Sequence, residues 1–162
     1  MGYGRFAAMI ATSTIVMFGL MYLNTWAVEH VFFSQTRLWM ALLMGATMAF
    51  IMMLFMLGMY PNRRANGAIL AASLLVFGGS LWLVRSQATV GQVAWMKAMI
   101  PHHSIAVLTS ARATLQDQRV RHLADQIIAT QLREIAEMRA LVAEIERSPS
   151  PASAPGLPPR MP

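Results

Sequence analysis

Two short runs of the chain carry residue types that bind soft metal ions. The first run reads Met96-Lys97-Ala98-Met99-Ile100-Pro101-His102-His103, and the second reads Gln131-Leu132-Arg133-Glu134-Ile135-Ala136-Glu137-Met138. Thioether and imidazole groups suit Cu(I), while imidazole with carboxylate also tolerates Cu(II). The candidate metal ligands are His102, His103, Met96, Met99, Met138 and Glu134.

The spacing of the first run predicts which side chains are neighbours on a helix. Met96, Met99 and His103 are three and four residues apart, so they share one surface of that helix. At about 100° per residue, His102 points roughly opposite the apolar stripe, toward solvent or a partner. The run therefore predicts one group of three possible ligands and one histidine that faces elsewhere.

The second run places polar residues on an apolar helix stripe. Glu134 and Met138 lie among isoleucines and leucines, and a buried carboxylate is costly unless something pairs with it. Asp117 is a plausible N-terminal cap for this helix, and a turn there makes the two helices antiparallel neighbours. Folding at that turn brings His103 near Glu134. The pair is either a buried hydrogen bond that fixes the register of the hairpin or part of a metal site.

Other chemistries are disfavoured by what the chain lacks. It has no cysteine, so thiolate metal sites and disulfides are excluded, and a zinc site built on methionine is not expected. A di-iron carboxylate site needs several Glu and repeated Glu-x-x-His motifs, which are missing. No nucleophile accompanies the histidines, and no phosphate-binding glycine loop is present. We therefore expect a protein that is not an enzyme.

The composition predicts a membrane protein. Of the 162 residues, 56% are hydrophobic and only 12% are charged. Stretches of at least about 17 apolar residues are long enough to cross a bilayer, and three occur, at about 6–28, 38–60 and 68–84. The net charge of +6 is scattered, with no basic stripe that carries interleaved aromatic residues. Nucleic acid is therefore not expected as a partner, and contact with anionic lipid head groups explains the charge more simply.

The arginines give a preferred orientation for three spans. Arg5, Arg63 and Arg64 fall on one side of the membrane, and Arg37 and Arg85 on the other. Positively charged residues are enriched in cytoplasmic loops. The N-terminus is therefore expected in the cytoplasm of a bacterial cell, and the domain after the third span on the periplasmic side of the inner membrane.

The second expected span carries a methionine at every fourth position. These residues are Met40, Met44, Met48, Met52 and Met56. They form either a thioether path for a soft cation or flexible packing between helices. Glu29 and His30 lie on the same side of the membrane as the hairpin and are candidates for a transfer route.

The whole chain is therefore expected to be all-α with three parts. Residues 1–85 form a three-span membrane anchor, residues 86–147 form an extramembrane antiparallel helical hairpin, and residues 148–162 form a disordered tail rich in Pro, Ser and Ala.

The hairpin resembles a known bacterial family. The His-His pair after Met-Ile-Pro, followed by Gln-x-x-Glu-Ile-x-x-Met, is similar to the domain-of-unknown-function family 305 over about residues 89–146. The resemblance implies a ferritin-like helical bundle and copper or silver binding through His and Met. The residues that this implies here are Met96, Met99, His102, His103 and Met138, with Glu134 in support. One helical pair is half of a four-helix bundle, so a second copy or another partner would complete it.

Two hypotheses follow from the sequence. In the first, a membrane-anchored hairpin binds copper, preferentially Cu(I), for tolerance, storage or delivery. In the second, the chain is a structural or assembly subunit of a membrane complex, or a homo-oligomerisation module, and the polar residues only set the register of the hairpin.

Overall fold

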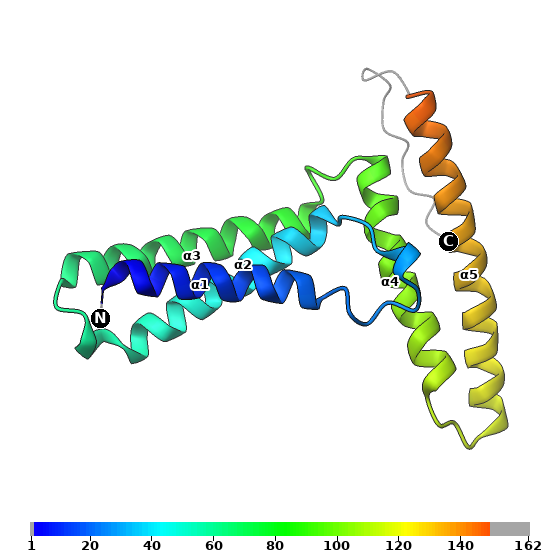
Figure 1. Ribbon diagram of the computed structural model, residues 1–162, viewed down its shortest axis with the longest axis horizontal. Coiled ribbons are helices and arrows are strands. Elements are labelled where there is room, and N and C mark those ends of the chain that lie inside the picture. Colours follow the sequence, from blue (N-terminus) through cyan, green and yellow to red (C-terminus); the bar gives the residue numbers. More distant parts are fainter. Residues whose placement is uncertain (1, 150–162) are drawn as a thin grey trace.

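The computed structural model describes residues 2–149, and within them the chain is α-helical with no strand (Figure 1). The elements in chain order are α1 (Tyr3–Leu20), η1 (Val28–His30), α2 (Gln35–Phe55), η2 (Leu57–Met59), α3 (Arg63–Ser86), α4 (Gln92–Arg112) and α5 (Gln118–Arg147), where η marks short 3-10 helices. The expected all-α fold is confirmed, with three candidate membrane helices followed by a helical hairpin. The expected disordered tail lies, from residue 150 onward, outside the described residues.

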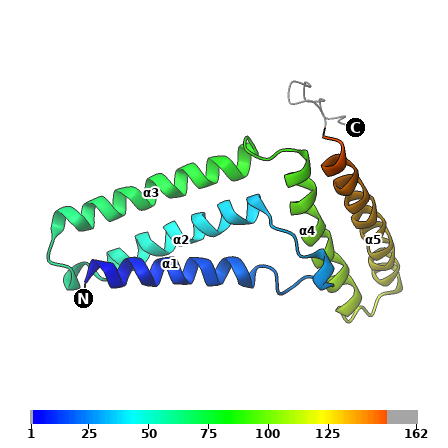
Figure 2. The same cartoon turned by 45° about the horizontal axis from the view of Figure 1, so that its top comes forward.

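The first three α-helices form a bundle in which α2 contacts both α1 and α3 (Figure 2). Each helix is long and apolar enough to cross a membrane, and few of their side chains are buried inside the protein. Phe6, Met53 and Tyr60 form the buried core near the start of α1, and Met52 and Met56 pack against it. For these two members of the methionine stripe, the contacts are those of packing residues.

The bundle helices begin and end at positions other than the expected spans. α1 stops at Leu20 rather than near residue 28, and turns with i to i+3 hydrogen bonds follow it. α3 begins at Arg63, before the expected residue 68, because the Asn62 side chain accepts hydrogen bonds from the backbone N–H groups of the next turn. α2 runs from Gln35 to Phe55 and is followed by η2. The segment from 21 to 34 is therefore a folded connection rather than the end of a span.

α4 and α5 form an antiparallel hairpin that lies across one end of the bundle (Figures 1 and 2). The expected N-terminal cap of α5 is confirmed, since the Asp117 side chain accepts a hydrogen bond of 2.8 Å from the backbone N–H of Arg119. Buried Ile100, Ile135 and Val142 belong to the core between the two helices. Figure 2 shows α4 next to the bundle and α5 on its far side.

The connection between α1 and α2 folds back onto the hairpin. The backbone N–H of Trp26 donates to Oγ of Ser104 over 2.8 Å, and Nδ1 of His30 lies 3.0 Å from the same oxygen. Phe32 packs against the core of the hairpin. The hairpin is thus attached to the bundle through this connection, through contacts of α4 with α2, and through the link between α3 and α4.

Candidate metal centre

His103 joins the two helices of the hairpin, and both nitrogens of its ring have a partner. Nδ1 lies 2.9 Å from the backbone oxygen of Met99, one helical turn earlier. Nε2 lies 3.0 Å from Oε2 of Glu134 on α5. The expected juxtaposition of His103 with Glu134 is confirmed, and it sets the register of α4 against α5.

The two contacts limit where the protons of the His103 ring can lie. A backbone carbonyl oxygen can only accept, so Nδ1 carries a proton and donates it to Met99. Nε2 then has three states available. It is protonated and forms an ion pair with Glu134, it accepts a hydrogen bond from a protonated Glu134 carboxyl, or it shares a cation with the carboxylate oxygen.

The hydrogen bond at Nδ1 is compatible with either an ion pair or a metal ligand at Nε2. Histidines that bind metal donate the second ring N–H to a carbonyl or carboxylate, which fixes the ring and its tautomer. The contact of Nδ1 with the Met99 carbonyl does this for His103. Two ligands bound to one ion at about 2.0–2.1 Å each can lie 3.0 Å apart. Nε2 of His103 and Oε2 of Glu134 are therefore the best-placed pair of ligand atoms in the hairpin.

Glu134 remains accessible on the solvent side of this pair. Its side chain is 40% exposed, whereas that of His103 is 14% exposed. The side chain of Gln131, one turn earlier on α5, donates to Oε2 of Glu134 over 3.3 Å. The carboxylate is therefore oriented from its own helix and can still be reached by an ion from solvent.

The three predicted methionine ligands lie in or against the hydrophobic core of the hairpin. Met96 and Met138 are 5% and 7% exposed and belong to one buried cluster, and Met99 packs against that cluster. Among residues 2–149, no three His, Asp or Glu side chains come together to hold a metal ion. A metal at this position would therefore depend on thioether sulfur, which favours soft ions over zinc.

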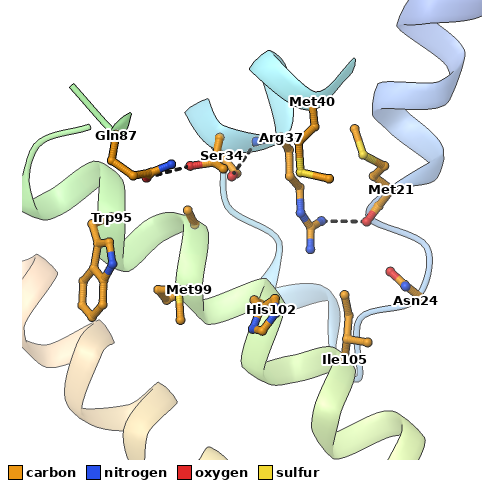
Figure 3. Close-up of a pocket in the computed structure, with 12 residues that line it drawn as sticks. Met21, Asn24, Ser34, Arg37, Met40, Gln87, Trp95, Met99, His102 and Ile105 are labelled. Carbon is orange, nitrogen blue, oxygen red and sulfur yellow. Dashed lines mark hydrogen bonds between the residues drawn. The ribbon is translucent and has the colours of Figure 1, made fainter. Parts of the chain in front are cut away.

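His102 does not join the pair of His103 and Glu134, and it lines a cavity together with Met99. Its side chain is exposed, and this cavity of about 530 Å³ lies between α4 and the bundle, on the side that faces Arg37 (Figure 3). The ring centroids of His102 and His103 are 6.1 Å apart. The two adjacent histidines therefore serve different surfaces, as the helix faces predicted.

His30 is buried near the hairpin core, a position that no helical periodicity could reveal. Burial lowers the pKa of His30 below its ordinary value, and Arg139 acts in the same direction while Glu29 opposes it. The Ser104 hydroxyl accepts from Trp26, so its own proton is available for Nδ1 of His30. Ser104 follows the two histidines directly, but its partner lies 74 residues away in sequence.

Comparison with known proteins supports the family resemblance of the hairpin. Residues 92–160 match the model of a family described as Domain of unknown function (DUF305). The match begins with α4, includes α5, and leaves out the three candidate membrane helices. The protein is thus all-α, with three candidate membrane helices and a hairpin whose sequence is similar to members of this family.

One curated relative can be aligned with part of the chain. The Uncharacterized protein L153 of Acanthamoeba polyphaga mimivirus is 35% identical over 66 residues, which is 40% of this chain and 43% of the viral protein. The aligned part therefore spans less than half the length of this relative. No solved structure matches the chain. Neither description names a ligand, so the residues of the site carry the functional argument.

Proposed function

We propose that this protein is a membrane-anchored copper-binding protein whose hairpin holds Cu(I), or the similar ion silver, for tolerance, storage or delivery. The bundle α1–α3 inserts in a bacterial inner membrane with the N-terminus in the cytoplasm, and the hairpin lies on the periplasmic side. The observation that carries the proposal is the geometry of His103, with Nδ1 held by a carbonyl and Nε2 facing the Glu134 carboxylate at 3.0 Å.

The neighbours of His103 support a soft ion. Met96 and Met138 lie in the core between the two helices and Met99 packs against it, so both helices of the hairpin that holds the His103 imidazole also carry thioethers. Thioether and imidazole together favour Cu(I) over harder divalent ions. The mostly buried His103 and the half-exposed Glu134 give an entry from the solvent side of the hairpin. When bound, copper would bring soft-metal coordination chemistry to a site that α4 and α5 build jointly.

Copper titration of the full-length protein in detergent tests this function. Cu(I) affinity would be measured under reducing conditions by competition with a chromophoric chelator. His103→Ala is expected to weaken the affinity by about tenfold or more, because removing even a supporting partner of a metal ligand costs 10–100-fold.

His122 offers a matched control for this titration. It is an exposed histidine on α5 whose Nε2 lies 3.1 Å from Gln126 Nε2, apart from the candidate site. His122→Ala is expected to keep wild-type affinity. Equal Cu(I) affinity of both variants, with unchanged helix content by circular dichroism, would refute the metal site.

A structural or assembly role is the second candidate, and the exposed apolar side chains along α5 favour it. Val120, Leu123, Ile127, Leu132 and Leu141 of this helix are between 37% and 56% exposed. Apolar side chains in such number on one helix are typical of a surface that a partner covers. Pairing of two hairpins would complete a ferritin-like four-helix bundle.

The mass of the detergent-solubilised protein distinguishes the two candidates. A dimer that forms in the presence of a strong copper chelator, and that Leu123→Glu dissociates, would support the assembly role. A protein that stays monomeric with and without copper would exclude homo-oligomerisation through α5.

A further inference from the structure

The cavity on the bundle side of α4 is lined by Met99 and His102, two of the predicted metal ligands, but it does not include the pair of His103 and Glu134. It has a volume of about 530 Å³, within the roughly 300–1,000 Å³ of small-molecule sites. Its apolar walls include Met40 of α2, and Trp95 and Ile105 of α4 (Figure 3). The cavity therefore offers apolar surface to a ligand while one of its walls carries a charge.

That charge belongs to Arg37, whose half-buried side chain projects into the cavity (Figure 3). Its Nη1 donates to the backbone oxygen of Met21 over 2.7 Å, and its Cζ lies 4.4 Å from the centre of the Tyr22 ring. These two contacts hold the guanidinium plane in place. Arg37 is thus oriented before any ligand arrives.

Most hydrogen-bonding capacity of this guanidinium is not used by the protein. The guanidinium has five N–H donors. Within residues 2–149 it donates one hydrogen bond, to the backbone oxygen of Met21. No carboxylate of the described chain lies within 4.0 Å of it, since the ion pairs there use other residues. A half-buried charge with unused donors is stabilised by an anion, and a guanidinium fits phosphate oxygens in pairs.

The rest of the lining reinforces the preference for an anion. The cavity contains no Asp or Glu, and its other polar groups include the amides of Asn24 and Gln87 and the imidazole of His102. The cavity lies where α1 ends, α2 begins and α3 ends. When the three helices cross a bilayer, this level coincides with the lipid head groups, beside acyl chains that can follow the apolar wall.

We propose that this cavity binds the phosphate group of an anionic membrane lipid, with Arg37 as its main ligand. The lipid tail leaves the cavity along Met40 and the membrane face of α2. An anionic lipid is preferred over a zwitterionic one, because no carboxylate in the lining can pair with a choline or ethanolamine. The site needs insertion of the bundle in a membrane but does not need metal in the hairpin.

Native mass spectrometry of the full-length protein tests this site. The protein would be solubilised with mixed phosphatidylglycerol and phosphatidylcholine of identical acyl chains, and the lipids it retains would be counted. We expect retained phosphatidylglycerol to exceed phosphatidylcholine several-fold. Arg37→Gln is expected to reduce the retained phosphatidylglycerol about tenfold, the effect of losing a charged hydrogen bond.

Arg85 and Asn24 provide the matched variants. Arg85 is exposed at the end of α3, on the same side of the bundle, and does not line the cavity, so Arg85→Gln makes the same change in charge without the expected loss. Asn24→Asp adds a negative charge to the lining without touching the contact between Arg37 and Met21. It is expected to lower phosphatidylglycerol retention even if Arg37→Gln were to misfold.

Competition with inorganic phosphate distinguishes a lipid from a free anion as the source of the phosphate group. Retention of phosphatidylglycerol in the presence of tens of millimolar inorganic phosphate supports the lipid. Displacement of the lipid by millimolar phosphate, or equal retention by Arg37→Gln, Asn24→Asp and Arg85→Gln, overturns the proposal. Failure of membrane insertion would appear separately, as loss of wild-type protein from alkali-washed membranes.

Discussion

At the scale of single residues, the imidazole of His103 decides between a structural pair and a ligand site. Its Nδ1 is fixed as a donor by the Met99 carbonyl, so all of its chemistry is left to Nε2. Glu134 stands in front of that nitrogen at 3.0 Å and is oriented by Gln131. An ion pair and a shared metal ion use the same atoms. Whether copper affinity depends on these atoms distinguishes the two, and the preferences of the two oxidation states then show which ligand serves which ion.

Glu134→Gln and Met99→Leu are expected to affect the two copper ions differently. Carboxylate suits Cu(II), so Glu134→Gln lowers Cu(II) affinity more than Cu(I) affinity. Thioether suits Cu(I), so Met99→Leu, which nearly conserves volume, has the opposite preference. Separate titrations with each ion measure both affinities. Glu137→Gln, an exposed carboxylate on the same helix, is the control, and a loss of equal size in this variant would contradict the assignment.

Protonation of His30 is expected to loosen the connection between α1 and α2. Burial, reinforced by Arg139 and opposed by Glu29, lowers the pKa of His30 from its ordinary value of 6.5. The folded state therefore binds this proton less readily than the unfolded state. The contribution of His30 to stability is complete above pH 6.5 and declines as the pH falls below that value toward the lowered pKa.

Hydrogen exchange at the amide of Trp26 measures this effect, since that amide donates to the Ser104 hydroxyl next to His30. After correction for intrinsic exchange, its protection is expected to be lower at pH 5 than at pH 8. His30→Gln cannot titrate and should show the same protection at both values. A wild-type protein with equal protection at both would contradict the prediction.

The residues of the site differ in how far the sequence could predict them. His103 and Glu134 could be paired because helical spacing and a short turn fix which side chains are level in a hairpin. The separation of His102 follows from the same geometry. The contact of His30 with Ser104 joins an irregular connection to a helix, so no period in the sequence encodes it.

At the scale of elements, the caps define the limits of the helices more reliably than hydropathy does. Asn62 and Asp117 were followed by helices because their side chains accept hydrogen bonds from the first turn. Hydropathy alone extended the first span to residue 28, beyond the end of α1 at Leu20. Apolar residues continue past this point, but there they serve a connection that packs on α4 rather than a helix.

Substitution of Asp117 is expected to destabilise the hairpin only when the new side chain cannot accept a hydrogen bond from the first turn of α5. Asp117→Ala removes the cap of α5 and lowers the melting temperature at pH 7, whereas Asp117→Asn keeps an acceptor and stays close to wild type. The contact with Arg119 lowers the pKa of Asp117. The charged contribution is therefore present above pH 3.8 and is lost as the pH falls through the lowered pKa.

Thermal unfolding of the three proteins followed by circular dichroism checks this prediction. Wild type and Asp117→Asn should differ least at low pH, where the carboxyl is protonated. Asp117→Ala melting with wild type at pH 7 would show that the cap has no part in hairpin stability.

At the scale of the whole molecule, the hairpin and the bundle are coupled by the connection between α1 and α2. This connection contacts α4 through Ser104 and also contributes Met21 and Asn24 to the cavity that contains Arg37. The pair of His103 and Glu134 lies on the α5 side of α4, whereas the proposed lipid site lies on its bundle side and is lined by Met99 and His102. If the bundle crosses a bilayer as proposed, α4 separates a surface directed to solvent from one directed to the membrane.

This arrangement requires the hairpin and the turn between α2 and α3 to lie on opposite sides of the membrane. The turn follows η2 at the far end of the bundle from α4 (Figure 1). Arg63 and Arg64 begin α3 there, and such positive charges favour the cytoplasmic side. The chain contains no cysteine, so a single introduced cysteine reports its own position without background. Pro61→Cys and Gln118→Cys place one in the turn and one at the first residue of α5, both at exposed positions.

A membrane-impermeant maleimide applied to spheroplasts is expected to label Gln118→Cys at once and Pro61→Cys only after lysis. The reason is that three spans put the two positions in different compartments, with the more positive one inside. A protein labelled at both positions before lysis would not be inserted as three spans. Labelling of Pro61→Cys alone before lysis would indicate the opposite orientation. The proposed copper site would then face the cytoplasm, where it could not serve periplasmic metal.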